Sequence, residues 1–460
     1  MKKNAYLPRV IDADYLGDYR IKLMLITRNS ALSTARNGSA AACSNRSKIK
    51  TTLRNSSSKA GRSPGLTALM NISSFTLDGN SLYFGAGYKL YRIDLSALSV
   101  ETVYSTDRIR VEQPLVADGI AYFGGITHTD KQGYRGETQG LFALDLQNKK
   151  VQWKFPLGVG GYGTFGTYPV VAGDQILVCA RQHLHCLDRE TGKELWKEDN
   201  WFGHDADGLT LPYVHKDSAF FMINEKYFTK SDELDGHWAR VLLESGQRVD
   251  ILRVAQSPGK YHDHNGQGIG RLVDGVIYGA SRYHSETYPA SWFGALDLES
   301  HKFLWEVPGS SLRTRPAVND KFVFTVREGS VQALDRRTGK VKWREPLGEI
   351  AQTDLDRSQD RWNWDYENQS SRRFDATNEV VVIQGSKGIA ARQADTGKLI
   401  WLVKTNSDYR NGDADPLIVQ QVVIVSSAID CSIFALDLKT GKELWRLTVP
   451  DCTYNYVFDD

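Results

Sequence analysis

The sequence predicts an all-β protein, an eight-bladed β-propeller in which each blade has four antiparallel strands. Three observations support this fold class. A hairpin-like segment recurs along the chain, its copies lie 38 to 58 residues apart, and two shorter apolar runs precede each copy. Repeats of this length are typical of propellers and solenoids, and four strands per repeat favour the propeller.

The recurring segment is clearest from Ile433 to Trp445, which reads IFALDLKTGKELW. Five further clear copies end at Trp153, Trp196, Trp305, Trp343 and Trp401. Two weaker copies, which end at Asp250 and Thr102, keep the apolar pattern and lose most of the signature. The copies therefore number eight, and seven blades is the alternative if one weak copy is irregular.

Each residue type in the segment has a physical reason to recur. The alternating apolar residues before the Asp predict a half-buried strand, and the run that ends at the Trp predicts the return strand. The Thr-Gly-Lys corner predicts a tight turn in which Gly takes a positive φ. We expect the Asp carboxylate to accept hydrogen bonds from turn amides and the Trp to pack against a neighbouring blade.

The chain divides into two parts by composition. Residues 1–64 are rich in Ser, Asn, Lys and Arg, and we expect them to be mostly disordered or to result from a wrongly assigned start. This part contains no clear secretory signal. The propeller is expected to occupy residues 65–460, with blade 1 starting near Ser74 and blade 8 ending near Val449.

Composition limits the classes of partner. The chain has 460 residues, 41% of them hydrophobic, and a net charge of only +2. A large core can form, and no general attraction to nucleic acid follows. We expect a monomer that neither binds nucleic acid nor inserts into a membrane.

The five cysteines do not show the spacing of a metal-binding finger. Cys186 stands at the alanine position of its repeat and is expected to be a small core residue. Cys431 and Cys452 lie in loops near the C-terminus. They either form a disulfide, share a metal or remain free.

Strand order divides the loops into two sets. Turns between strands one and two and between strands three and four are minimal, so one face of the propeller is plain. The opposite face carries the long loops between strands two and three and between blades, which are rich in His, Tyr, Arg and Trp. Function is expected on this elaborated face.

The repeat resembles the pyrroloquinoline-quinone-like propeller family through the ALDxxTGKxxW signature, over about 380 residues. The family includes quinone-dependent alcohol dehydrogenases, the propeller subunit of the outer-membrane assembly machine, and propeller polysaccharide lyases such as those acting on ulvan. A dehydrogenase is disfavoured because the chain lacks the adjacent Cys-Cys pair typical of those enzymes. The resemblance implies a secreted or periplasmic protein.

The loop chemistry looks like that of the lyases, so the first functional expectation is β-elimination of a uronate-containing, sulfated, ulvan-like polysaccharide. The reaction needs a cation to neutralise the carboxylate, a base and an acid. No cofactor is required, a structural metal ion is left open, and the expected partner is an anionic polysaccharide. The alternative is a non-catalytic scaffold for protein–protein interaction in the cell envelope.

Nine residues are candidates for the lyase site. The candidate catalytic residues are His128, His204, His264 and Tyr283. The candidate substrate-binding residues are Arg282, Arg315, Arg373, Tyr168 and Trp362. For the arginines at the entry to the first strands, the alternative is a structural ion pair with a loop carboxylate such as Asp205, Asp207 or Asp415.

Overall fold

The structure of the chain is a computed structural model. It describes residues 9–15, 21–26, 72–106, 109–127, 138–159, 169–180, 183–198, 212–224, 233–234, 236–253, 257–258, 270–280, 292–308, 315–327, 330–350, 373–385, 387–405, 414–427 and 430–450. The chain separates into two compact units, Met1–Ala68 with Asn455–Asp460, and Leu69–Tyr454.

The first unit contains one small sheet. Strands β1 (Arg9–Tyr15) and β2 (Ile21–Ile26) pair in antiparallel fashion. Two short strands therefore lie within the segment that was expected to lack structure. The remainder of residues 1–64 lies outside the described residues.

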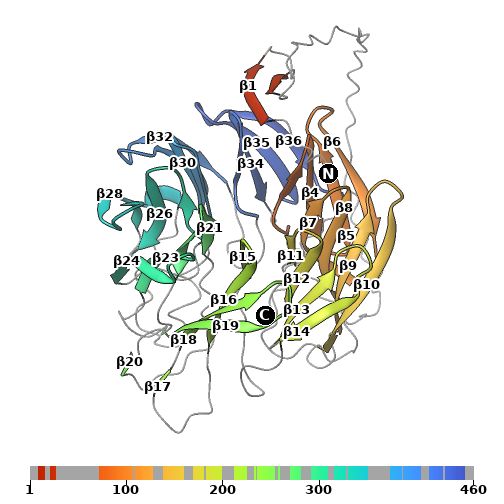
Figure 1. The fold of residues 1–460 in the computed structure, drawn as a ribbon. Coiled ribbons are helices and arrows are strands. Elements are labelled where there is room, and N and C mark those ends of the chain that lie inside the picture. The colour runs from red at the N-terminus through yellow and green to blue at the C-terminus, as the bar shows by residue number, and fades with distance from the viewer. Residues whose placement is uncertain are drawn as a thin grey trace, which may run out of the picture. The chain divides into compact units, whose positions relative to one another are not determined.

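The second unit contains eight four-stranded antiparallel sheets (Figure 1). Within each sheet the strands lie side by side in the order in which they occur along the chain. The first strands are β3 (Thr76–Asp78), β7 (Ile109–Ala117), β11 (Pro169–Ala172), β15 (Tyr213–His215), β21 (Arg271–Val273), β25 (Ala317–Val318), β29 (Arg373–Ala376) and β33 (Leu417–Val419). The second strands are β4 (Ser81–Ala86), β8 (Ile120–Thr127), β12 (Gln175–Ala180), β16 (Ser218–Asn224), β22 (Val276–Ala280), β26 (Phe322–Arg327), β30 (Val380–Gly385) and β34 (Val422–Ser427).

The third strands are β5 (Lys89–Asp94), β9 (Thr138–Asp145), β13 (His183–Asp188), β18 (Gly236–Leu242), β23 (Trp292–Asp297), β27 (Ser330–Asp335), β31 (Gly388–Gln393) and β35 (Ser432–Asp437). The fourth strands are β6 (Ser99–Ser105), β10 (Lys150–Val159), β14 (Glu194–Glu198), β19 (Arg248–Arg253), β24 (Lys302–Pro308), β28 (Val341–Pro346), β32 (Leu399–Lys404) and β36 (Glu443–Thr448). One short 3-10 helix, η1 (Gly348–Ile350), links blades 6 and 7. The eight-bladed propeller of four-stranded blades is confirmed.

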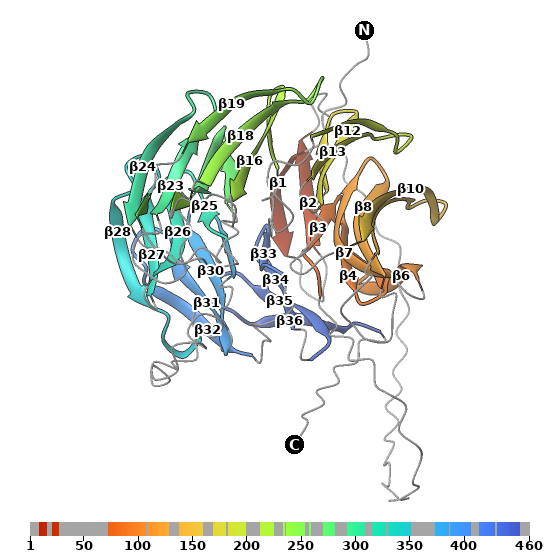
Figure 2. The same ribbon diagram turned by 90° about the horizontal axis from the view of Figure 1, so that it is seen from below.

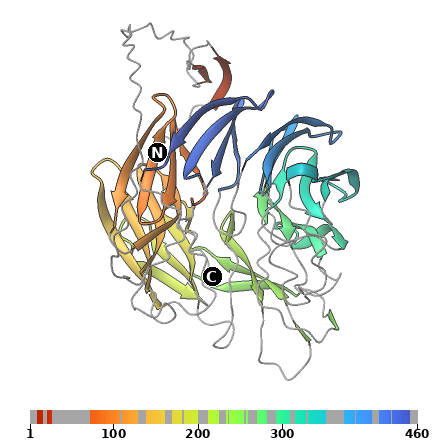
Figure 3. The same ribbon diagram turned by 180° about the vertical axis from the view of Figure 1, so that it is seen from behind.

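Eight hydrophobic clusters hold the blades together, one between each pair of neighbours. The cluster that joins the last blade to the first contains Ile424 and Ile433 of blade 8 with Phe84 and Ile93 of blade 1. Figures 1 and 3 both show these two blades, blue and orange, side by side. The ring therefore closes by side-chain packing between two complete blades.

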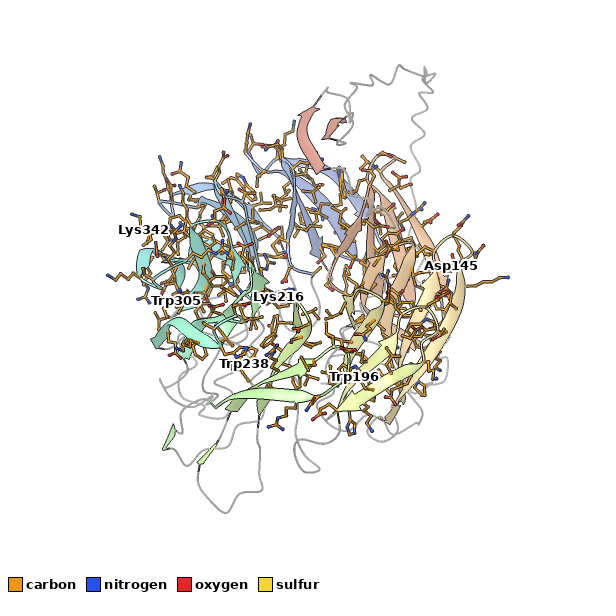
Figure 4. All side chains as sticks on the ribbon, in the orientation of Figure 1. Asp145, Trp196, Lys216, Trp238, Trp305 and Lys342 are labelled. Atoms are coloured by element: carbon orange, nitrogen blue, oxygen red, sulfur yellow. The ribbon has the colours of Figure 1, made fainter. Side chains whose placement is uncertain are left out.

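The first strands form the inner end of each blade, and the fourth strands lie at the outer edge (Figure 2). First strands of neighbouring blades contact one another, as β25 and β29 do. Outer-edge residues such as Asp145 and Lys342 lie on opposite sides of the ring (Figure 4).

The Asp of the repeat caps its turn as predicted. Asp188 Oδ1 accepts hydrogen bonds from the amide and the hydroxyl of Thr191 at 2.8 and 2.6 Å. The hydrogen bond from the hydroxyl has the larger effect, and together the two bonds hold the pKa of Asp188 below its usual range because they stabilise the charged carboxylate. Asp335 makes the same contacts with Thr338.

The Trp and Gly of the repeat join neighbouring blades, and we call this contact the tryptophan clasp. The Trp ring of one blade lies on the turn Gly of the next, and its Nε1–H donates to a backbone carbonyl of that next blade. The five clasps are Trp153 on Gly192, Trp196 on Gly246, Trp305 on Gly339, Trp343 on Gly397 and Trp401 on Gly441. All five glycines have φ between +68° and +74°, as predicted for this turn.

A β-bulge sets the register of the clasp. In blades 2 to 8 the pairing of the third and fourth strands shifts by one residue at the same place, and in blade 1 it shifts two residues earlier, between Leu90 and Tyr91. In blade 6 the shift puts the small Ala333 opposite Trp343. The bulge thereby turns the large ring toward the next blade.

Cys186 takes the small-residue position opposite Trp196 and is fully buried, so its predicted place in the core is confirmed. Burial raises the pKa of its thiol to about 12. Because the thiolate is the reactive form, we expect Cys186 to resist iodoacetamide in the native protein and to react after denaturation. Peptide mass spectrometry of both samples measures this. Equal labelling of Cys186 with and without denaturant would contradict the burial.

Candidate functional site

The ends of the described strands place both sets of long loops at one end of the blades. The connection from strand two to strand three and the connection to the next blade start and finish on the side opposite the tight turns. In blade 4, β17 (Glu233–Leu234) of the first connection pairs with β20 (Ser257–Pro258) of the second. These two loops of the elaborated face therefore meet.

Seven of the nine candidate site residues lie outside the described residues. They are His128, His204, His264, Tyr283, Arg282, Tyr168 and Trp362. Their proposed catalytic and binding roles stay predictions. Arg373 begins β29, and Arg315 lies just before β25, at the inner end of blade 6.

Arg315 makes the structural ion pair that was the alternative to anion binding. Its guanidinium Nη1 lies 4.0 Å from Asp415 Oδ2 of blade 8, and both side chains are partly exposed, at 40% and 33%. A pair this long and this exposed is weak. Arg315 therefore keeps part of its hydrogen-bonding surface available.

A second ion pair lies on the inner strands, and sequence reasoning missed it. Arg271 of β21 and Asp375 of β29 approach to 3.4 Å, and Asp375 also accepts a hydrogen bond from the amide of Ile418 at 2.7 Å. Both charged side chains occupy inward positions of strands that read as ordinary repeat segments. The sequence signal is a charged residue on a first strand, Arg271 in RLV and Asp375 in RFDA.

Tyr213 completes this set of inner residues. Its hydroxyl accepts a hydrogen bond from the amide of Gly270 at 2.7 Å, and its side chain is buried. Burial raises the pKa of Tyr213 to about 12, and the nearby Arg315 lowers it by less. A phenol with such a pKa stays neutral at physiological pH, so Tyr213 is a structural hydrogen-bond partner.

Taken together, these residues join the inner ends of blades 4 to 8. Each arginine of the two ion pairs belongs to one blade, and its aspartate belongs to the second blade along the ring. The two positive and two negative charges cancel. The two ion pairs thus tie the inner ends of blades 5 to 8 together.

The part of the chain that the structure describes shows neither a metal-binding cluster nor a membrane-spanning helix. There, no group of three or more His, Cys, Asp or Glu side chains is placed to hold a metal ion. Nor does any helix within those ranges have the length and apolar character needed to cross a membrane.

Cys431 is disulfide-bonded, and its backbone carbonyl accepts a hydrogen bond from the amide of Val449 at 2.8 Å. The predicted partner, Cys452, lies outside the described residues. The hydrogen bond nevertheless places the chain three residues before Cys452 next to Cys431.

Comparison with protein families gives an extended match. A family model described as outer membrane protein assembly factor BamB matches residues 134–345 and 347–454. Among curated proteins, the serine/threonine-protein kinase AfsK of Streptomyces griseus is 24% identical over 152 residues, which cover 31% of this chain and 17% of the kinase. The chain thus spans less than a fifth of that relative's length.

Solved structures with a similar fold are distant in sequence. BamB from Moraxella catarrhalis is 12% identical, with a TM-score of 0.49, and the match covers 77% of this chain and 91% of that one. Hsv2 of Kluyveromyces lactis is 8% identical, with a TM-score of 0.41, covering 83% and 100%. A eukaryotic initiation factor gives 9% identity and a TM-score of 0.47, covering 82% and 87%.

Proposed function

Because this chain belongs to the propeller family described as outer membrane protein assembly factor BamB, we propose that it is a non-catalytic scaffold for protein–protein interaction in the cell envelope. The observation that carries the proposal is the extent of the family match. It runs from the loop before β9 of blade 2 to the end of blade 8 and so includes most of the ring. The short signature alone would not separate a scaffold from an enzyme.

The structure supports a scaffold through its rigidity. Hydrophobic clusters occupy all eight interfaces between blades, and tryptophan clasps reinforce five of them. A ring held in this way fixes the strand ends from which the long loops of the elaborated face start. Loops on a rigid framework suit the binding of partner proteins.

The disulfide of Cys431 supports a location outside the cytoplasm. Disulfides form and persist in the periplasm and in secreted proteins, whereas cytosolic reductants keep thiols reduced. Cys186 is a free cysteine, and it is buried in the core. An envelope location thus agrees with the cysteine chemistry as well as with the family.

The lyase expectation draws no support from these matches, and the scaffold alternative is the better supported of the two. Arg315, the one candidate of the nine whose side chain the structure describes, is paired with Asp415.

Genetic deletion in the source cell tests the scaffold function. We expect outer-membrane β-barrel proteins to fall in abundance, because their assembly would lose a binding platform, and a tagged copy of this chain to restore them. Crosslinking of the tagged copy should yield an adduct with a component of the outer-membrane assembly machine. Unchanged barrel proteins together with no such adduct would refute the proposal.

A test of the rival function uses the purified protein. We expect incubation with ulvan and other uronic polymers to give no ultraviolet absorbance from an unsaturated uronate product. A rise in that absorbance would establish the lyase in place of the scaffold.

A further inference from the structure

The interface between blades 4 and 5 departs from the clasp. The bulge of blade 4 pairs Arg240 with Asp250, so Asp250 stands in the register position that Trp holds in the clasps. In blade 5 the turn position of the clasp glycine is His301, with a φ of 55°. Both halves of the clasp are therefore replaced at one interface.

A small apolar pocket lies at this place. Its wall includes Phe220, Trp238 and Arg240 of blade 4 and Leu296, Leu298 and His301 of blade 5. Figure 4 shows Trp238 between the blades that carry Trp196 and Trp305. The cavity volume of the pocket is about 10 Å³, which is room for one water molecule.

Two residues of the pocket wall, Phe220 and Leu298, are equivalent to residues that contact the Trp ring in the tryptophan clasps. Phe220 is equivalent to Tyr122 and Tyr278, whose rings lie 6.0 and 6.3 Å from Trp153 and Trp305. The carbonyl of Leu298 is equivalent to those of Arg189 and Arg336, which accept the indole N–H at 3.1 and 2.9 Å.

His301 occupies part of the same space. The His301 ring lies 5.8 Å from the Phe220 ring. This is close to the distances between the clasp tryptophans and the tyrosines equivalent to Phe220. The side chain is only half-buried and sits on a turn at the edge of the blade. Rotation of His301 toward solvent would enlarge the pocket without moving a strand.

We propose that the pocket between blades 4 and 5 is a binding site for an indole ring. The ring enters as His301 turns outward, packs against Phe220 and Leu296, and donates its N–H to the carbonyl of Leu298. Arg240 lies at the wall and adds a cation–π contact. The ligand is recognised by the geometry that the protein itself uses five times.

The site does not depend on the proposed scaffold function, because binding is measured on the purified protein. Titration with N-acetyl-tryptophanamide, followed by calorimetry and by NMR, should show saturable binding at one site. The phenylalanine analogue should bind less tightly by about tenfold, because it lacks the N–H donor. Equal affinity for the two analogues, or no saturation, would overturn the proposal.

Two further ligands separate the sources of the indole. Free indole tests a small-molecule site, and a short peptide with a central Trp tests recognition of a polypeptide. Tighter binding of the peptide than of N-acetyl-tryptophanamide indicates a partner protein, and tighter binding of indole indicates a metabolite. Either result supports the pocket, whereas binding of neither ligand refutes it.

Variants place the binding in this pocket. His301→Gly should raise the affinity for N-acetyl-tryptophanamide by about tenfold, since the ligand no longer displaces the imidazole. The matched control is Lys149→Gly, which makes the same change at the equivalent turn of blade 2, where φ is 54°. An equal gain in both variants would contradict the pocket.

A double variant tests the geometry without any ligand. Asp250→Trp with His301→Gly recreates a clasp and should both raise the melting temperature above that of His301→Gly alone and abolish ligand binding. Retained binding in a double variant with a raised melting temperature would show that the ligand binds elsewhere. If the double variant does not fold, the comparison of His301→Gly with Lys149→Gly still decides the matter.

Discussion

Replacing Trp343 by alanine is expected to lower the free energy of unfolding by about 3–5 kcal/mol, as for other buried aromatic side chains. Trp343 is 8% exposed and packs in the hydrophobic cluster between blades 6 and 7. Its Nε1–H donates to the carbonyl of Ala394 at 2.9 Å. The truncation therefore leaves a cavity and an unpaired buried carbonyl, and urea unfolding followed by tryptophan fluorescence and circular dichroism measures the loss.

Two controls separate the parts of this effect. Trp343→Phe keeps most of the apolar ring and loses the hydrogen bond, which should cost about 1 kcal/mol for the bond. Trp445→Ala removes the equivalent ring of blade 8, which is only half-buried and faces a turn that carries Leu98 instead of Gly. An equal loss for Trp343→Ala and Trp445→Ala would show that the clasp adds nothing to ordinary burial.

The repeat could be predicted from sequence because its features are local. A turn of fixed length favours Gly at its positive φ, and the carboxylate reaches the free turn amides two and three residues after it. Asp188, Thr191 and Gly192 behave in this way. The number of blades followed by counting copies, even where Asp250 and Thr102 replace the terminal residues.

The ion pair of Arg271 with Asp375 could not be predicted because it joins residues far apart in sequence. Arg271 and Asp375 belong to blades 5 and 7, and nothing in either repeat indicates the other. Arg315 was identified as an inner arginine, and Asp415 was named among its structural partners. The choice between ion pairing and ligand binding required the positions of the strands around them.

The function was harder to predict than the fold for a related reason. The signature ALDxxTGKxxW consists of residues that join blades, so it carries information about packing and none about a substrate. The catalytic candidates, among them His204 and Tyr283, came from loops that lie outside the described residues. The copy that ends at Asp250 was seen as a weak repeat and the copy that starts at Phe293 as a clear one, but only the structure shows that their departures from the signature, Asp250 and His301, fall at one interface.

Replacing Gly441 by alanine should cost about 2–5 kcal/mol of unfolding free energy, more than a methyl group normally does. Gly441 has a φ of +70°, where a side chain costs about 1–2 kcal/mol. The new Cβ would also lie 2.6 Å from the Trp401 ring, and overpacking of this kind costs about 1–3 kcal/mol. Because the Trp401 Nε1–H is bound to the carbonyl of Leu438 at 2.8 Å, the ring cannot retreat without losing that bond.

The matched control for Gly441→Ala is Gly173→Ala in blade 3. Gly173 has a φ of +63°, and a Cβ built there meets no atom within 4 Å, so this variant carries the backbone cost alone. The difference between the two losses, measured by urea unfolding, isolates the contact of the turn with the indole. A difference near zero would mean that the Trp401 ring and the turn of Gly441 adjust freely to the added methyl group. The same adjustment at the pocket would then let an indole bind beside His301 without the imidazole turning outward.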